Sequence, residues 1–219
     1  MDRLKQVSKA HQRYYTSWGE LVPGSTTVTG LLNKPALVKW ANQLGLQGID
    51  STKYVDKAAK VGTLIHYLVE CHITNKKPDL SDYSKFEIEL ANVGFNKYLD
   101  WDKKHTVEPI FNEKGFASDK YKYGGTCDFY CKLDGKNTLI DFKSCKGIYD
   151  EQFVQVSSYA NLLIENGHKV EQILILRIGR DETEGFEEKY IIQKQSKLYF
   201  DVFKNLLKIY YLKKKIGWR

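Results

Sequence analysis

The sequence has few of the features that mark membrane, secreted or repetitive proteins. No apolar run approaches the ~18 residues that a membrane span needs, and the first fifteen residues contain no apolar signal-peptide core. There are only four prolines, no low-complexity tract and no internal repeat, which is typical of an ordered globular chain. The four cysteines form no C-x-x-C pair, which favours packed, reduced thiols. We therefore expect a cytoplasmic protein without membrane contact.

The charge is positive overall but unevenly distributed. Residues 1–60 hold 9 Lys or Arg against 4 Asp or Glu, and residues 189–219 hold 9 against 1. The 128 residues between them hold 16 against 22, so an acidic middle lies between two basic ends within a net charge of +7. This pattern favours a carboxylate site that receives a polyanion. A lysine-rich solvated surface would give the same numbers, so charge alone is weak evidence.

Hydrophobic spacing and turn residues predict a helical first half followed by a sheet. Residues 18–30 are expected to form a loop. The expected helices are 3–15, 35–45, 52–75, 82–104, 150–167 with Asp150 as N-cap, and 195–215. The expected strands are 106–113, with Pro109 at an edge or bulge, a hairpin within 124–144, and strands at 171–179 and 185–193.

This order predicts a mixed α/β fold with a central mixed sheet flanked by helices. No segment has the composition of a linker, so we expect one domain over residues 1–219. Within it we expect a helical N-terminal lobe (1–104), a catalytic sheet core (105–193) and a C-terminal helix (194–219).

The predicted hairpin carries an unusual concentration of charge. Asp134-Gly135 indicates a two-residue type I′ turn, so the numbers of paired residues sum to 269 and Asp128 faces Asp141. Alternation then assigns the residues to two faces. One face is charged: Thr126, Asp128, Tyr130, Leu139, Asp141 and Lys143. The other is apolar: Cys127, Phe129, Cys131, Ile140 and Phe142.

Two opposed carboxylates would repel each other at the ~5 Å that separates cross-strand Cβ atoms. A divalent cation such as Mg²⁺ or Mn²⁺ would remove that repulsion. An exposed sheet face with a Lys143–Asp141 pair explains the same residues, and a three-residue loop would shift the register by one. Geometry alone leaves a metal site and a solvated face about equally supported.

Four other polar residues could likewise be functional or ordinary structural residues. His66 lies among apolar neighbours of a long predicted helix, where a packed core histidine is commoner than a ligand. Gln155 and Tyr159 lie one turn apart on a helix, as a surface pair would. Glu108 precedes the hairpin and suits an exposed edge strand.

Taken in order, these residues resemble a known family. His66, "GGTCD" ending in Asp128, "DFK" at 141–143 and "QVSSY" at 155–159 are similar to the signature of the PD-(D/E)XK nuclease superfamily. The closest branch contains the RecB nuclease domain, CRISPR-associated RecB-like nucleases and the mitochondrial genome maintenance exonuclease, with phage and bacterial exonucleases. The resemblance covers roughly residues 60–178. It implies a restriction-endonuclease-like core.

The resemblance also implies roles for these residues. Asp128, Asp141, the backbone carbonyl of Phe142 and His66 would hold Mg²⁺ or Mn²⁺, and Lys143 would orient the attacking water or neutralise the phosphate. Gln155 and Tyr159 would steady the substrate strand. Glu108 is a candidate for a second metal or a water, and Glu70 for supporting His66. Some relatives carry an iron–sulfur cluster on later cysteines; with none after Cys145, we expect no cluster here.

The implied function is a metal-dependent DNA exonuclease acting on single strands or DNA ends in recombination, repair or replication. It would work in a bacterial or phage-infected cell, alongside a recombination or replication protein. A structure- or site-specific endonuclease and a non-hydrolytic nucleic-acid-binding module are the alternatives. Aromatic residues in the lobe, including Trp18, Trp40 and the Tyr14-Tyr15 pair, lead us to expect that the lobe closes over the site. Such a site would be threaded by a free end.

Overall fold

The computed structural model describes residues 3–4, 12–32 and 34–218, and it shows a mixed α/β fold. One five-stranded sheet has the order β5-β6-β7-β8-β9, with strands β5 (Val107–Ser118), β6 (Tyr123–Leu133), β7 (Lys136–Lys143), β8 (Gln172–Ile178) and β9 (Phe186–Ile191). Within this sheet only the β7–β8 pair is parallel. Helix α5 (Asp150–Glu165) connects those two strands. The predicted mixed sheet flanked by helices is confirmed.

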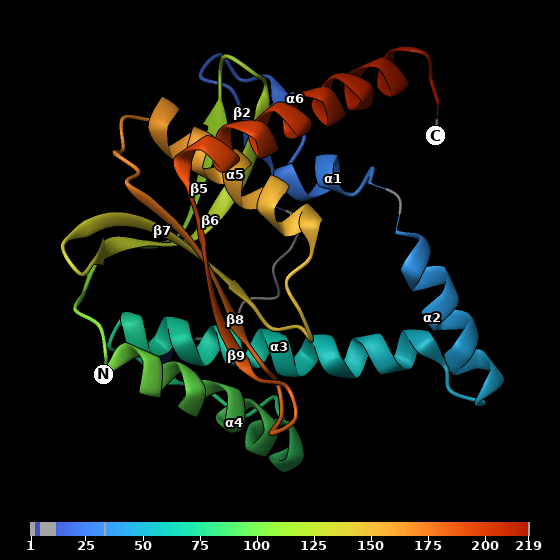
Figure 1. Ribbon diagram of the computed structural model, residues 1–219, viewed down its shortest axis with the longest axis vertical. Helices are drawn as coiled ribbons and strands as arrows, with labels where there is room; N and C mark the ends of the chain where they lie inside the picture. Colours follow the sequence, from blue (N-terminus) through green and yellow to red (C-terminus); the bar gives the residue numbers. More distant parts are fainter. Residues whose placement is uncertain (1–2, 5–11, 33, 219) are drawn as a thin grey trace.

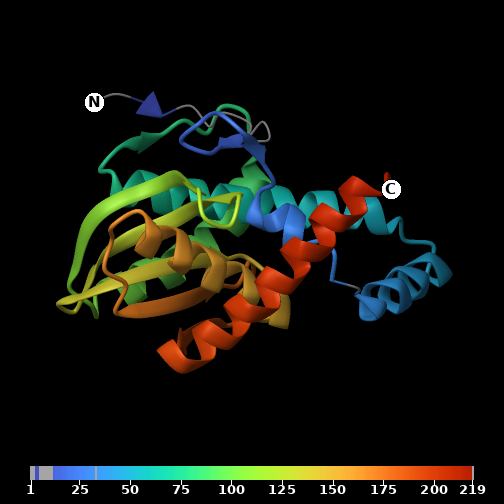
Figure 2. The same ribbon diagram turned by 90° about the horizontal axis from the view of Figure 1, so that it is seen from above.

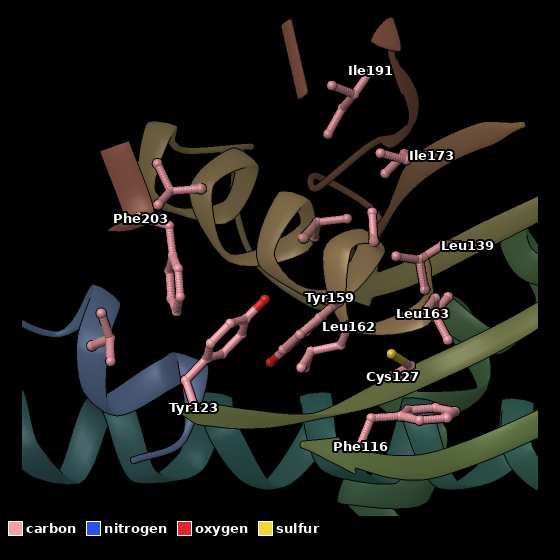
Figure 3. Close-up of a cluster of buried hydrophobic side chains, with 14 of the residues drawn as sticks. Phe116, Tyr123, Cys127, Leu139, Tyr159, Leu162, Leu163, Ile173, Ile191 and Phe203 are labelled. Atoms are coloured by element: carbon pink, nitrogen blue, oxygen red, sulfur yellow. The ribbon is translucent and has the colours of Figure 1, made fainter. Parts of the chain in front are cut away.

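Helices cover both faces of the sheet (Figures 1 and 2). On one face α3 (Ser51–Ile73) and α4 (Lys85–Asp102) pack side by side and share a core with Phe129, Ile140 and Phe142. On the other face α5, α6 (Gln193–Lys215) and the short α1 (Ser25–Thr29) enclose a second core. Tyr159 and Leu162 of α5 lie beside Cys127 of β6 in this second core (Figure 3). Among the described residues, no helix is both long enough and apolar enough to span a bilayer.

The hairpin prediction is confirmed in its turn and register. Asp134 and Gly135 both have positive φ, 51° and 81°, as a type I′ turn requires. The β6–β7 ladder runs from Leu133–Lys136 to Phe129–Ile140, so every pair sums to 269. Pro109 lies at a register shift in the edge strand β5, as a residue without an N–H should.

The predictions for the first third of the chain were partly wrong. Helix α2 (Pro35–Leu46) confirms one helix, but Arg3–Leu4 and Tyr14–Tyr15 are the short strands β1 and β2 rather than parts of one helix. Residues 5–11 of that predicted helix lie outside the described residues. The expected loop contains β3 (Leu21–Val22), which pairs with β2, and α1. A short β4 (Lys77–Pro78) pairs with β1.

The predicted lobe therefore contributes to both sides of the sheet, with α1 on one face and α3 and α4 on the other. The single domain over 1–219 stays a prediction. Asp150 is the first residue of α5 rather than its N-cap, which is Tyr149.

Candidate active site

The candidate site lies where the central strands of the sheet separate. The β6–β7 ladder ends at Phe129–Ile140, one residue before the two carboxylates. Beyond that pair β6 continues along β5, whereas β7 continues along β8, where Asp141 pairs with Ile175. The backbone N–H of Phe142 donates to Asp128 Oδ2 at 3.1 Å, so a side chain takes the place of the missing ladder bond.

A cavity of about 790 Å³ lies at this fork. The sheet contributes acidic and basic groups, while two helices contribute the walls. Helix α3 lines the cavity with Ala59, Gly62, Thr63 and His66, and helix α5 lines it with Gln152, Gln155 and Tyr159. The strands and the loop after them add Glu113, Gly125, Thr126, Asp128, Phe142, Lys143, Ser144 and Cys145. Predicted motif residues from four separate segments, α3, β6, β7 and α5, thus meet at one cavity.

Asp141 and Lys143 form a buried ion pair beside the cavity. Asp141 Oδ2 lies 2.6 Å from Lys143 Nζ, and the Asp141 side chain is only 1% exposed. Burial raises the pKa of Asp141 to about 7; Lys143 opposes the rise, while the charges of Asp128 and Glu113 add to it. Burial would lower the pKa of Lys143, but the charges of Asp141 and Asp128 raise it overall. The alternative of a solvated sheet face is therefore wrong, although its Lys–Asp pair is present.

Helix α5 holds Lys143 through a chain of hydrogen bonds. Lys143 Nζ donates to Gln155 Oε1 at 3.0 Å, and Gln155 Nε2 donates to the Tyr159 hydroxyl at 2.7 Å. Burial raises the pKa of Tyr159, and the charges of Asp141 and Asp128 add to this, so the hydroxyl stays neutral. Gln155 and Tyr159 thus position the lysine in addition to lining the cavity.

The Gly124-Gly125 pair permits two rings to lie directly against β6. A Cβ at Gly125 would lie 2.6 Å from Tyr159 Cε1, and one at Gly124 would overlap the Tyr14 ring. Tyr14 and Gln12 also bond Thr126, the first through its hydroxyl at 2.9 Å and the second through Oε1 at 2.6 Å. The sequence placed Tyr14 in a helix and did not mark Gln12, so this contact with β6 was missed.

His66 lies on the cavity wall in α3, half-buried, with its ring edge-on to Phe142 at 6.1 Å between centroids. It therefore faces the predicted site. Its role as a metal ligand stays a prediction.

Glu113, which the sequence did not mark, occupies the place predicted for a strand-β5 carboxylate. Its neighbours Asn112 and Lys114 pair with Phe129 and Cys127, so Glu113 is level with Asp128, and its φ of 49° interrupts the pleat. On the partner strand Cys127 packs with the α5 core rather than with Phe129, contrary to the predicted alternation.

Two weaker candidates lie elsewhere. Glu108 pairs with Lys132 across the ladder at 3.9 Å, towards the turn, and is not among the described residues that line the cavity. Glu70, one turn after His66, is likewise not among those described lining residues. The sequence could have indicated Glu113 instead of Glu108 only through the register of β5 against β6. That register depends on the bulge at Pro109.

The oxygen and nitrogen atoms at the candidate site are of the kinds that bind a hard cation. Carboxylates of Asp128, Asp141 and Glu113 with the His66 imidazole are ligands that Mg²⁺ or Mn²⁺ accepts. Burial is the main cause of the raised pKa of Asp141, and the charges of Asp128 and Glu113 add to it. In the described part of the chain, however, no three His, Cys, Asp or Glu side chains are placed together as a ligand set. Asp141 Oδ2 is already paired with the lysine ammonium at 2.6 Å.

Comparison with family models and with curated proteins gave no match. Fifteen chains of solved structures match, among them one titled "Crystal structure of SSO0001". That chain is 13% identical, the match covers 70% of this chain and 74% of the other, and the TM-score is 0.32. A likeness this weak carries no argument about function.

Proposed function

We propose that the protein is a divalent-metal-dependent deoxyribonuclease that acts from free DNA ends. The observation that carries the proposal is the buried Asp141–Lys143 pair beside Asp128 and Glu113 at a cavity. Buried charges of this kind are costly for stability, and titratable groups with strongly shifted pKa values gather at catalytic sites. The ordered resemblance to PD-(D/E)XK nucleases supports the same assignment.

In this proposal Asp128, Asp141 and the Phe142 carbonyl hold Mg²⁺ or Mn²⁺, with His66 and Glu113 as further donors. The bound ion would polarise a phosphoryl oxygen and lower the pKa of a water. Lys143 would leave Asp141 and turn its ammonium towards the scissile phosphate, where it neutralises developing charge. Gln155 and Tyr159 would limit how far it moves.

Action at ends follows in this proposal from the two helical walls. Helix α3 lines the cavity opposite α5, with the sheet residues between them. A strand that enters between two helices is most simply threaded from an end. We accordingly propose single-stranded DNA or frayed ends as substrate, in the cytoplasm of a bacterial or phage-infected cell. A recombination or replication protein would be its partner.

The test is a digest of one single-stranded sequence, end-labelled and linear or closed and circular, with Mg²⁺, Mn²⁺ or EDTA. We expect loss of the linear form with either metal, none with EDTA, and an intact circle. Comparable nicking of the circle would favour an endonuclease. Binding of both forms without cleavage under any metal would favour a non-hydrolytic module.

A further inference from the structure

Two tryptophans lie exposed outside the candidate active site. Trp18 is 58% exposed in the turn between β2 and β3, and Trp218 is 66% exposed directly after α6. Neither is among the described residues that line the cavity. Large exposed aromatic rings mark contact surfaces more often than chance because their exposure to water is unfavourable.

A chain of contacts connects Trp18 to helix α6. Lys122, in the turn between β5 and β6, places its Nζ 5.9 Å from the Trp18 ring centroid and 3.0 Å from Glu20. The Tyr211 hydroxyl of α6 donates to the Lys122 carbonyl. Lys214, one turn further along α6, is close enough to act on Glu20, whose pKa is lowered mainly by Lys122 and Trp18.

The end of α6 holds Trp218 beside more lysines. Gly217 has a φ of 68° and turns the chain back, so that the Trp218 N–H donates to the Lys213 carbonyl at 2.9 Å. Lys213 Nζ then lies 5.2 Å from the Trp218 ring centroid. The last turn contains Lys213, Lys214 and Lys215 in succession, where cations also favour the helix dipole.

We infer that this Trp18–Trp218 surface, made of Trp18, Lys122, Tyr211, Lys213, Lys214 and Trp218, binds single-stranded nucleic acid away from the cavity. Exposed indole rings stack on bases, while lysines beside them neutralise phosphates. The single-stranded form is favoured because a duplex keeps its bases from the rings. The nature of the bound polymer rests on the proposed function, whereas the surface itself rests on contacts of residues that do not line the cavity.

The first test uses tryptophan fluorescence with a 20-nucleotide thymidine oligomer in EDTA. We expect saturable quenching and an affinity at least about tenfold weaker in the Trp18→Ala, Trp218→Ala double variant, since each stacked base contributes substantially. The matched Trp18→Phe, Trp218→Phe variant should keep most of the affinity and lose most of the quenching. Unchanged affinity in the alanine variant would overturn the inference, as would equal affinity for a duplex of the same length.

The second test measures how the affinity depends on salt. Replacing Lys213, Lys214 and Lys215 with alanine should lower the log–log salt slope by up to about 2, at about 0.7 for each phosphate contact. Replacing Lys85, Lys103 and Lys169, whose side chains are 92%, 73% and 73% exposed, removes the same charge elsewhere. Equal slopes for the two triple variants would refute the surface.

The two proposals fail separately. Surface-dependent binding without cleavage in Mg²⁺ or Mn²⁺ would refute the nuclease and keep the surface. Cleavage by a protein whose affinity is unchanged by the five alanine substitutions at these tryptophans and lysines would refute the surface and keep the nuclease.

Discussion

Asp141 is a buried carboxylate of the candidate site. A carboxylate at 1% exposure that lies near Asp128 and Glu113 is stabilised as an anion by one lysine alone in the described part of the site. The pKa of Asp141 is about 7 in the folded chain, against an ordinary value of 3.8. Between pH 4 and pH 7, therefore, Asp141 is protonated in the folded chain and ionised in the unfolded chain. Asp141 therefore contributes stability below about pH 4, and that contribution is lost as pH rises through 7.

This linkage gives a prediction for Asp141→Asn in the absence of divalent ions. Relative to the variant, the wild type should lose unfolding free energy between about pH 4 and pH 7. The upper bound is on the order of 4 kcal/mol, from about 1.36 kcal/mol for each pKa unit. Chemical denaturation of both proteins across this range measures it. A difference between them that does not change with pH would contradict the raised pKa.

The fork between β6 and β7 is the element that creates the cavity, and Gly125 allows α5 to close on it. Gly125→Ala should push the Tyr159 ring away and destabilise the fold by about 1–3 kcal/mol, as overpacked sites do. The displaced Tyr159 should also release Gln155 and with it Lys143. Gly147→Ala is the matched control, because its Cβ would meet Tyr149 at an ordinary 3.9 Å. Equal melting temperatures for the two variants would show that Tyr159 does not depend on Gly125.

Local signals were enough to predict the hairpin and its flanking elements. The Asp134-Gly135 turn fixed the register, and Pro35, Gly167 and helical spacing located three of the helices near their observed ends. The basic, aromatic N-terminal run was misread because β2 depends on pairing with β3 and on packing of Tyr14 against Gly124. A single-sequence pattern does not contain those partners.

The environment of the candidate site depended on longer-range contacts. Asp141 is buried because β8 pairs in parallel some thirty residues later and α5 covers the fork, so no local pattern distinguishes it from an exposed residue. Glu113 was missed because its place opposite Asp128 depends on two features that a sequence pattern does not show. These are its own positive φ and the bulge at Pro109. The motif spacing predicted which residues meet, and the sequence allowed a Lys143–Asp141 pair, but neither predicted that this pair would be buried.

At the scale of the whole molecule, the two proposals rest on two separate features. The cavity between α3 and α5 contains the acidic cluster with Lys143, and the Trp18–Trp218 surface lies at the basic end of α6. The lysines in the last turn of α6 thus belong to a surface that does not line the cavity.

The most direct test is a cleavage time course on end-labelled single-stranded DNA with Mg²⁺, comparing wild type, Asp141→Asn and Lys143→Ala, each with a parallel Mn²⁺ titration. We predict that both substitutions reduce cleavage by at least about 10²-fold. Only Asp141→Asn should also weaken Mn²⁺ binding, because Lys143 is not a ligand. Cleavage by Asp141→Asn at the wild-type rate, or a wild type that neither binds Mn²⁺ nor cuts DNA, would contradict the account.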